Sequence, residues 1–505
     1  MLHRATPQDA KPRLAHRLRT ATGLILAAGF LTLGAGFDAV AQPKKKPTTP
    51  QKTGDGEPTV ASAPKPARKI SRKKTVRDKN SVEGIADFGT SHFLLHTDLS
   101  DEESEELLDR LETMLELISK YWGRAPAGVI EMFVVKNLTK WPTGAIPQEG
   151  LDSIHGGTGI TVTRRISSGD AFIAKSIVYA VADRGTPQHE VVHAYCGQAF
   201  GRPGPLWYSE GMAEMGQYWR ANDLSVNANR HAIRYLRTSE PKSLREIVYA
   251  KEFTGDSWQN YAWRWALCHL LATNSNYQAR FHALGLALLT NQPDASFEQA
   301  FGGMAQEISF EYRQFLAHVD TGFRADLCSW DWKAKFKLAK TGNVTPAKIE
   351  AGKGWQPSRL IVTEGEDYEY SVAGKWSTQS DGPLVDADGD ERGRARLVGA
   401  LLTEVNGDYF LSEPFELGKF GFFTSPGPGN LYLRCRDDWS SIADNRNSVA
   451  VRLKLKSKGP PLAPPKEDDG KKKAAEKTPL GKTTPDKTPL DNTLPDKSRP
   501  GKKPA

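Results

Sequence analysis

The residues with the clearest capacity for chemistry lie in the stretch HEVVH, which contains His189, Glu190 and His193. Histidines four positions apart lie on one face of a helix, so both imidazoles can reach the same metal ion, as tetrahedral zinc requires. Glu190 stands beside the first histidine, where a carboxylate can take a proton from water bound to the metal and pass it on. The stretch therefore predicts a helical zinc site with Glu190 as its general base.

A chain with 11 histidines among 505 residues can also contain this pattern by chance, on an ordinary helix. The sequence downstream decides between the two interpretations. Glu210 follows His193 after 16 intervening residues, in the stretch WYSEGMAE, and the turn-forming stretch GRPGP lies between them. A carboxylate on the next helix supplies the third protein ligand of a catalytic zinc site, whose fourth position stays open for water.

The stretch HEVVH followed by PLWYSEGMAE resembles the gluzincin zinc metallopeptidases, in particular the bacterial peptidase MA-like group. The resemblance covers about residues 85–325 and implies that His189, His193 and Glu210 bind zinc. It also implies a role for Glu214, because gluzincins often carry an acidic residue there that accepts a hydrogen bond from the first histidine. The alternative for Glu214 is a solvent-facing position on the helix.

A peptidase also needs a donor for the oxyanion of the tetrahedral intermediate, and in gluzincins a tyrosine often provides it. The resemblance points to Tyr261, in QNYAWRWALCHLL, as that catalytic residue, and to Tyr208 as a second candidate. The alternative for Tyr261 is a packed core tyrosine. The resemblance further implies that a strand before the zinc helix borders the groove for an extended peptide. The stretch GITVTR (159–164) is such a strand, although the sequence does not show which strand forms the sheet edge.

The elements that must position these residues alternate between strands and helices over residues 81–335. Residues 91–97 and 129–135 are apolar runs bounded by turn residues and are predicted to be strands. Between them, Ser100 and Glu103 form a capping-box pattern that begins an amphipathic helix, and Gly123 ends it.

The helix predicted to contain His189 and His193, called the zinc helix below, begins with residues typical of a helix N-terminus. Thr186 is predicted as its N-cap and Pro187 as its first helical residue.

Residues 350–457 differ in pattern, with short alternating runs separated by turn residues about every 8–12 positions, which predicts an all-β sandwich or barrel. They resemble the calcium-dependent galactophilic lectins of bacteria over about residues 358–455. The resemblance implies a possible calcium site in the loop RDDWSSIADNRNS. Oxygen atoms of the loop would bind the calcium ion, and the ion would also bind sugar hydroxyls. The implied ligands are Asp437, Ser441 through its carbonyl, Asp444 and Asn445. Trp439 and Arg446 are bulkier than that family's pattern.

The two ends of the chain do not have the composition of folded domains. Residues 1–41 combine basic residues, an apolar run of 17 residues (21–37) and small residues before Gln42, which predicts a secretory signal peptide cut after Ala41. The alternative is an uncleaved membrane anchor. Residues 42–80 and 458–505 are rich in Lys, Pro and Thr and poor in large apolar residues, so we expect a disordered linker and tail.

The distribution of charge and the cysteine spacing limit which ligands and partners the chain is expected to bind. The terminal segments 1–41, 42–80 and 459–505 carry a formal +16 against +8 for the whole chain, which leaves −8 for residues 81–458. An acidic folded part argues against a nucleic-acid-binding face. The four cysteines lack CxxC spacing, which disfavours a cysteine zinc cluster and leaves disulfides and buried thiols as alternatives.

Together these features predict an α+β chain: a gluzincin-type zinc peptidase domain (81–335) followed by a lectin-like β-sandwich (350–457). The expected function is an exported metallopeptidase that hydrolyses peptide or protein substrates by zinc-activated water, while the sandwich attaches it to a cell-surface glycan. It would be secreted, periplasmic or held at the cell surface, with only the signal segment meeting the membrane. The alternative is a non-catalytic secreted carbohydrate-binding or adhesion protein with a peptidase-like scaffold.

Overall fold

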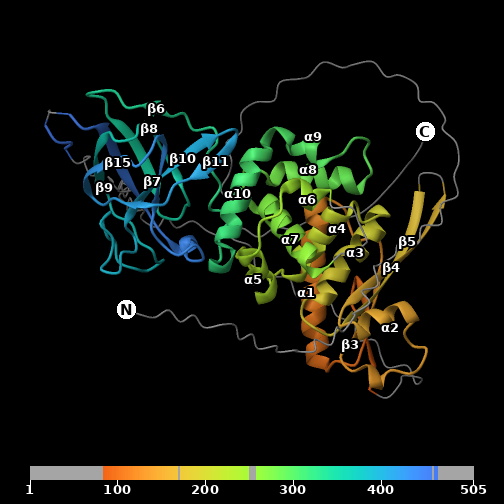
Figure 1. Cartoon of the computed structure of the whole chain (residues 1–505). Helices are drawn as coiled ribbons and strands as arrows, with labels where there is room; N and C mark the ends of the chain where they lie inside the picture. The colour runs from red at the N-terminus through yellow and green to blue at the C-terminus, as the bar shows by residue number, and fades with distance from the viewer. Residues whose placement is uncertain (1–83, 169–170, 250–256, 458–459, 464–505) are drawn as a thin grey trace, which may run out of the picture. The chain divides into compact units, whose positions relative to one another are not determined.

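The computed structural model describes residues 84–168, 171–249, 257–457 and 460–463, all within one contact unit of the chain (Figure 1). The predicted signal peptide (1–41), the linker (42–80) and nearly all of the predicted tail (458–505) lie outside the described residues. Within the described part, no helix combines the length and apolarity that a membrane crossing needs. The described residues form an α+β structure, as predicted.

A five-stranded sheet carries the N-terminal half, with the order β1-β2-β3-β5-β4. Its strands are β1 Ala86–Gly89, β2 Phe93–Thr97, β3 Ile130–Val135, β4 Gly159–Ser168 and β5 Ala171–Val181. β2, β3 and β5 are parallel neighbours, while β1 and β4 pair antiparallel at the two edges. The strands predicted at 91–97, 129–135 and 159–164 are confirmed. The stretch GITVTR lies in β4, an edge strand, and the strand next to the zinc helix in sequence is β5, which the sequence analysis missed.

Helix α1 Asp101–Trp122 follows β2 as expected. Ser100 accepts a hydrogen bond from the backbone N–H of Glu103, whose side chain in turn accepts one from the Ser100 N–H, so the predicted capping box is confirmed. Gly123 ends the helix in the left-handed conformation, with φ of 67°. Its lack of a Cβ makes that conformation inexpensive.

The remaining elements before the sandwich are mostly helical. They are η1 Leu138–Lys140, α2 Gln148–His155, α3 Thr186–Phe200, α4 Leu206–Gln217, α5 Arg230–Thr238, α6 Leu244–Val248, α7 Trp258–Thr273, α8 Gln278–Leu289, α9 Phe297–Phe301, η2 Gly302–Met304, α10 Ala305–Ala317 and η3 Val319–Thr321.

Helices cover both faces of the sheet. α1 and α3 share one apolar core with β2 and β3, and α2 packs in a smaller cluster on the opposite face, around Tyr179 of β5. α7 is a deeply buried helix: residues 262–271 are all buried, and the helix packs against α4, α5, α6, α8 and α10. This central helix fixes α4, which in turn carries a predicted zinc ligand.

Two sheets form the C-terminal half, as the alternating sequence predicted, and their strands pair antiparallel except for β6, which is parallel to β8. One has the order β11-β10-β14-β8-β6, with β12 beside β10, and the other has the order β13-β9-β15-β7. Their inner faces share one apolar core that includes Ile349 and Val451 from one sheet and Leu401 and Leu431 from the other. The elements are β6 Lys337–Leu338, β7 Thr345–Glu350, β8 Gln356–Val362, β9 Asp367–Ala373, β10 Leu397–Val405, β11 Asp408–Leu411, β12 Phe415–Glu416, β13 Phe420–Thr424, β14 Gly429–Cys435, η4 Ile442–Asp444 and β15 Ser448–Leu455.

All four cysteines are buried free thiols, which settles the alternative that the sequence left open. Burial in apolar surroundings raises the pKa of each thiol, to about 12 for Cys435. A thiol with a raised pKa is a poor nucleophile and a poor metal ligand at neutral pH. The cysteines therefore contribute packing, and Cys196 on the zinc helix is not a ligand.

One buried histidine gives the fold a specific acid sensitivity. His269 on α7 stacks on Phe315 with ring centroids 5.4 Å apart, and its Nε2 has no hydrogen-bond partner. Burial lowers the pKa of His269 from 6.5 to about 4, against the raising effect of Asp326. In the unfolded chain His269 therefore becomes protonated below about pH 6.5, whereas in the folded protein it stays neutral down to about pH 4. The free energy of unfolding consequently decreases as the pH falls from 6.5 to about 4.

We expect the variant His269→Phe to lose less stability in acid than the parent. Between pH 7 and pH 4 the difference should approach about 3 kcal/mol in the free energy of unfolding, because each unit of pKa shift corresponds to about 1.36 kcal/mol. Denaturant unfolding of both proteins across this pH range measures it. An equal loss of stability in both proteins would contradict the assignment.

Candidate metal centre

The zinc helix α3 begins at Thr186, and its N-cap is Gly185. The predicted N-cap at Thr186 and first helical residue at Pro187 were therefore one residue late. The reason is Asp183, whose Oδ1 accepts hydrogen bonds from the N–H groups of Gly185 and Thr186 at 2.8 and 2.6 Å. A carboxylate that satisfies the free N–H groups of the first turn does the work expected of a capping threonine.

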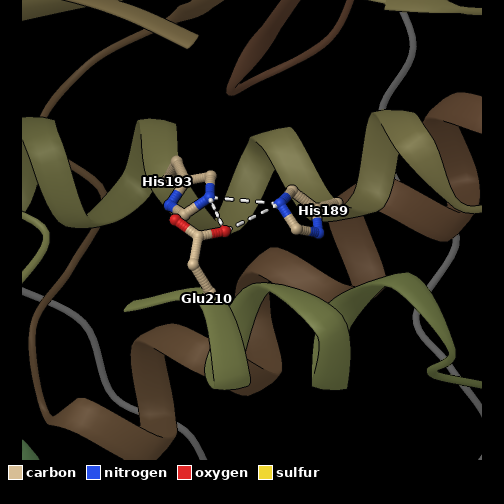
Figure 2. A group of neighbouring side chains, drawn as sticks. All are labelled: His189, His193 and Glu210. Carbon is tan, nitrogen blue, oxygen red and sulfur yellow. Dashed lines mark hydrogen bonds and ion pairs between the residues drawn. The ribbon is translucent and has the colours of Figure 1, made fainter. Parts of the chain in front are cut away.

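Three side chains from α3 and α4 converge as predicted (Figure 2). Nε2 of His189 lies 3.2 Å from Nε2 of His193, and Oε2 of Glu210 lies 3.4 Å from each of them. Among the described residues, this is the one group of three or more His, Cys, Asp or Glu side chains close enough to hold a metal ion.

The size of this triangle is the size that zinc requires. Ligand atoms about 2.05 Å from a tetrahedral ion are separated by about 3.4 Å along each edge of the tetrahedron. The three separations of 3.2, 3.4 and 3.4 Å are close to that edge. The donor set of two imidazole nitrogens and one carboxylate oxygen also suits zinc. The residues present therefore fit a zinc ion with one coordination position left open.

The position of Glu210 depends on how closely α4 approaches α7. A Cβ added at Gly211, the next residue, would lie 2.3 Å from Sγ of Cys268 and 3.0 Å from the carbonyl oxygen of Arg264. No side chain fits at that distance, so glycine allows the two helices to touch along this face. The contact holds α4 in place behind the ligand.

Each histidine has a polar group at its second nitrogen. Oε1 of Glu214 lies 3.2 Å from Nδ1 of His189, at ion-pair distance although not in good hydrogen-bond alignment. Glu214 is buried, so the solvent-facing alternative for it is excluded. Oγ of Ser209 lies 3.3 Å from Nδ1 of His193. Ser209 was missed in the sequence, where its only signal is its place beside Glu210. Such partners orient imidazole ligands and strengthen them.

The electrostatics of the site favour a cation. Burial opposes a charge on His189, yet the neighbouring carboxylates of Glu210, Glu214 and Glu190 raise its pKa well above 6.5. Burial likewise opposes the charge on Glu210, but His193 and His189 lower its pKa far below 4.5. Three carboxylates around two imidazoles leave excess negative charge in a buried place, which a divalent cation would neutralise.

Of the two tyrosine candidates, the structure brings only Tyr261 to the site. Its ring centroid lies 6.3 Å from that of His189, and the residue is only partly buried on α7. Tyr208 is 1% exposed, and its hydroxyl accepts a hydrogen bond from Nε1 of Trp122 at 3.0 Å. Burial also raises the pKa of Tyr208 well above 10. Tyr208 is therefore a core residue, and its candidacy as an oxyanion donor was wrong.

The predicted calcium residues lie around the short helix η4 in the sandwich. Oδ2 of Asp437 and Oδ1 of Asn445 are buried without a hydrogen-bond partner, and Asn445 uses its amide nitrogen to donate to the Ala351 carbonyl at 3.1 Å. The carbonyl of Ser441 accepts a hydrogen bond from the Asp444 N–H at 3.2 Å, and the Asp444 side chain is exposed. The structure thus brings the side chains of Asp437 and Asn445 to an inward position and leaves that of Asp444 outside.

Comparisons with known proteins add little to this geometry. No protein-family model matches the chain, and no curated protein matches it. Among solved structures, the EclA N-terminal domain, a PllA-like lectin, is similar to it at 16% identity and a TM-score of 0.18, over 22% of this chain and 95% of that one. A functionally unknown conserved protein from Bacillus anthracis str. Ames is similar at 12% identity and a TM-score of 0.14, over 24% of this chain and 22% of that one.

Similarity at such TM-scores carries no argument for fold or function, so the gluzincin and lectin resemblances stay predictions.

We expect Glu214→Gln to weaken zinc binding by about 10- to 100-fold, because the substitution removes the charge beside Nδ1 of His189. Glu116→Gln, an exposed position on α1, is the matched control and should bind zinc as the parent does. Competition with a chromophoric chelator measures the dissociation constants. Equal affinities for the parent and Glu214→Gln would contradict the role given to Glu214.

Proposed function

We propose that this protein is an exported zinc-dependent metallopeptidase of the gluzincin type, which hydrolyses peptide bonds in peptide or protein substrates. The observation that carries the proposal is the triangle of His189, His193 and Glu210, whose atoms stand 3.2–3.4 Å apart. A purely structural zinc site has four protein ligands, whereas a catalytic one keeps a position open. Three ligands with a carboxylate next to them in sequence fit the catalytic kind.

Zinc in this site would polarise a substrate carbonyl and lower the pKa of a bound water to about 7. Glu190, beside His189 in sequence, would take the proton of the attacking water and pass it to the leaving amine. Tyr261, whose ring centroid lies 6.3 Å from that of His189, would donate a hydrogen bond to the developing oxyanion. β4 has an open side, because its one partner strand within the described part of the chain is β5, so it offers main-chain groups to an extended peptide.

A second activity is proposed for the sandwich, which would bind calcium and through it a cell-surface glycan. The observation that favours it is the pair of buried, unpartnered oxygens on Asp437 and Asn445. Unsatisfied buried oxygens are costly, and a calcium ion takes oxygen ligands of this kind. Such a sandwich would hold the enzyme at a surface after export, in the periplasm or outside the cell. A sandwich that binds while the zinc site does no chemistry is the alternative.

Glu190→Gln separates the enzyme from the non-catalytic alternative. The amide keeps the shape of the side chain and cannot take a proton, so cleavage of a mixed peptide library should fall by about 10²- to 10⁴-fold. Zinc content should stay at one ion per chain in both proteins, and Glu116→Gln should cleave as the parent does. Stoichiometric zinc with the same background cleavage in the parent and Glu190→Gln would exclude the enzyme.

For the sandwich, we expect calcium to raise the midpoint of thermal unfolding of the zinc-loaded protein by at least about 2 °C. Asp437→Asn should remove that shift, whereas the control Asp438→Asn, at the exposed neighbouring position, should keep it. Differential scanning calorimetry with and without calcium measures both. Glycan-array binding that persists in a calcium chelator would contradict a calcium-bridged sugar site.

A further inference from the structure

We infer that Thr161, on the edge strand β4, is a positioning residue that holds the carboxylate of Glu190 in its working place. The inference rests on the proposed function for its catalytic meaning, but the contact itself is a property of the fold. Oγ1 of Thr161 lies 2.8 Å from Oε2 of Glu190 and 2.9 Å from the Glu190 carbonyl oxygen. Among the described residues, it is the hydrogen-bond donor found for this carboxylate.

The neighbouring glycine supports the same function. Gly159 and Thr161 are two positions apart on β4, so they face the same side of the sheet, towards α3. A Cβ added at Gly159 would lie 2.8 Å from Cγ of Glu190 and 2.8 Å from Cγ2 of Thr186. The aliphatic part of Glu190 therefore fills the space that a side chain at 159 would need. Gly159 leaves the room, and Thr161 binds the head of the side chain.

The contact between Thr161 and Glu190 matters for the position of the carboxylate because Glu190 is buried. Glu190 is 6% exposed, so little water is available to solvate its carboxylate. A buried carboxylate without a donor is strongly disfavoured and turns towards any group or solvent that can bind it. The hydroxyl of Thr161 therefore decides which rotamer of Glu190 is favoured. A base that is displaced by about 1 Å loses about 10²-fold in rate, because proton transfer depends on close alignment.

The hydroxyl of Thr161 has two acceptors within reach, Oε2 and the carbonyl oxygen of Glu190. One hydroxyl therefore contacts both the head and the backbone of the same glutamate.

β4 offers a matched control. Thr163 lies two residues further along on the same face of the strand, and its Oγ1 is 2.8 Å from Oγ of Ser176 rather than from any group of the metal centre. Thr163→Val therefore removes a threonine hydroxyl from the same strand without touching Glu190. Thr161→Val removes the contact at nearly constant volume, and Thr161→Ser restores a hydroxyl at the same place.

The experiment uses the full zinc-loaded chain. Kinetics are measured on a quenched fluorescent peptide that the parent protein cleaves in the peptide library. Crystal structures are determined for the parent and each variant. We expect Thr161→Val to lower kcat by about 10- to 100-fold with little change in KM, because it displaces the base and leaves substrate contacts intact. Thr161→Ser should recover most of kcat, and Thr163→Val should match the parent. All variants should bind one zinc ion, because Thr161 touches none of the ligands.

The crystal structures give a readout that does not depend on activity. The Glu190 carboxylate should leave its position in Thr161→Val and keep it in Thr161→Ser and Thr163→Val. An unmoved carboxylate in Thr161→Val, or an equal loss of kcat in Thr163→Val, would overturn the inference. If the parent cleaves no better than Glu190→Gln, the proposed function fails instead, and the crystal structures alone decide whether Thr161 positions Glu190.

Discussion

The arrangement of the N-terminal half depends on one constraint: ligand atoms from two helices must meet within 3.4 Å of one another. Helix axes normally pack about 8–10 Å apart. An imidazole from α3 and a glutamate side chain from α4 can together span such a distance and meet between the two helices. A shift of α4 by a fraction of a turn would remove Oε2 of Glu210 from both nitrogens. The packing of α4 on α7 at Gly211, and the buried α7 behind it, fix that distance.

The same convergence creates a cost that the rest of the fold must offset. Glu190, Glu210 and Glu214 lie around two imidazoles in a place that is nearly closed to water. Mutual repulsion and desolvation of these carboxylates destabilise the protein without a cation. The helix nevertheless stays in register, since Val191, Val192 and Ala194 on its other faces are buried in the main core. Apolar packing sets the geometry, and the charge cluster makes a divalent cation its natural counterpart.

Sequence alone predicted which three side chains converge, because the information is local. A spacing of four residues on a helix determines that His189 and His193 share a face, and a motif on the next helix identifies Glu210. Capping is equally local, so the start of α1 at Ser100 was correct. Residues whose role depends on contacts between elements were not predicted: Ser209 beside His193, and Thr161 on Glu190. The contacts of Asp183 with Gly185 and Thr186 are local and were missed as well. No spacing rule reports that a strand hydroxyl meets a helix carboxylate 29 residues away.

β5 was missed for a related reason. It is an interior strand with neighbours on both sides, and its apolar run lacks the strict alternation that identifies a strand with one wet face. Its insertion between β3 and β4 has a structural consequence. It moves β4 to the sheet edge while the antiparallel pairing of Thr161 with Val178 keeps the start of β4 against α3.

β4 consequently has two different sides at the metal centre. The side chain of Thr161 is directed to Glu190, and Gly159 leaves room for that glutamate. Among the described residues, one line of the main-chain groups of β4 has no strand beside it. A peptide that paired with that edge would bind to the same short segment that holds the base. Pairing stiffens a strand, because each added ladder hydrogen bond restricts its backbone. Substrate binding and the placement of Glu190 would then be linked through two residues of β4, without any larger conformational change.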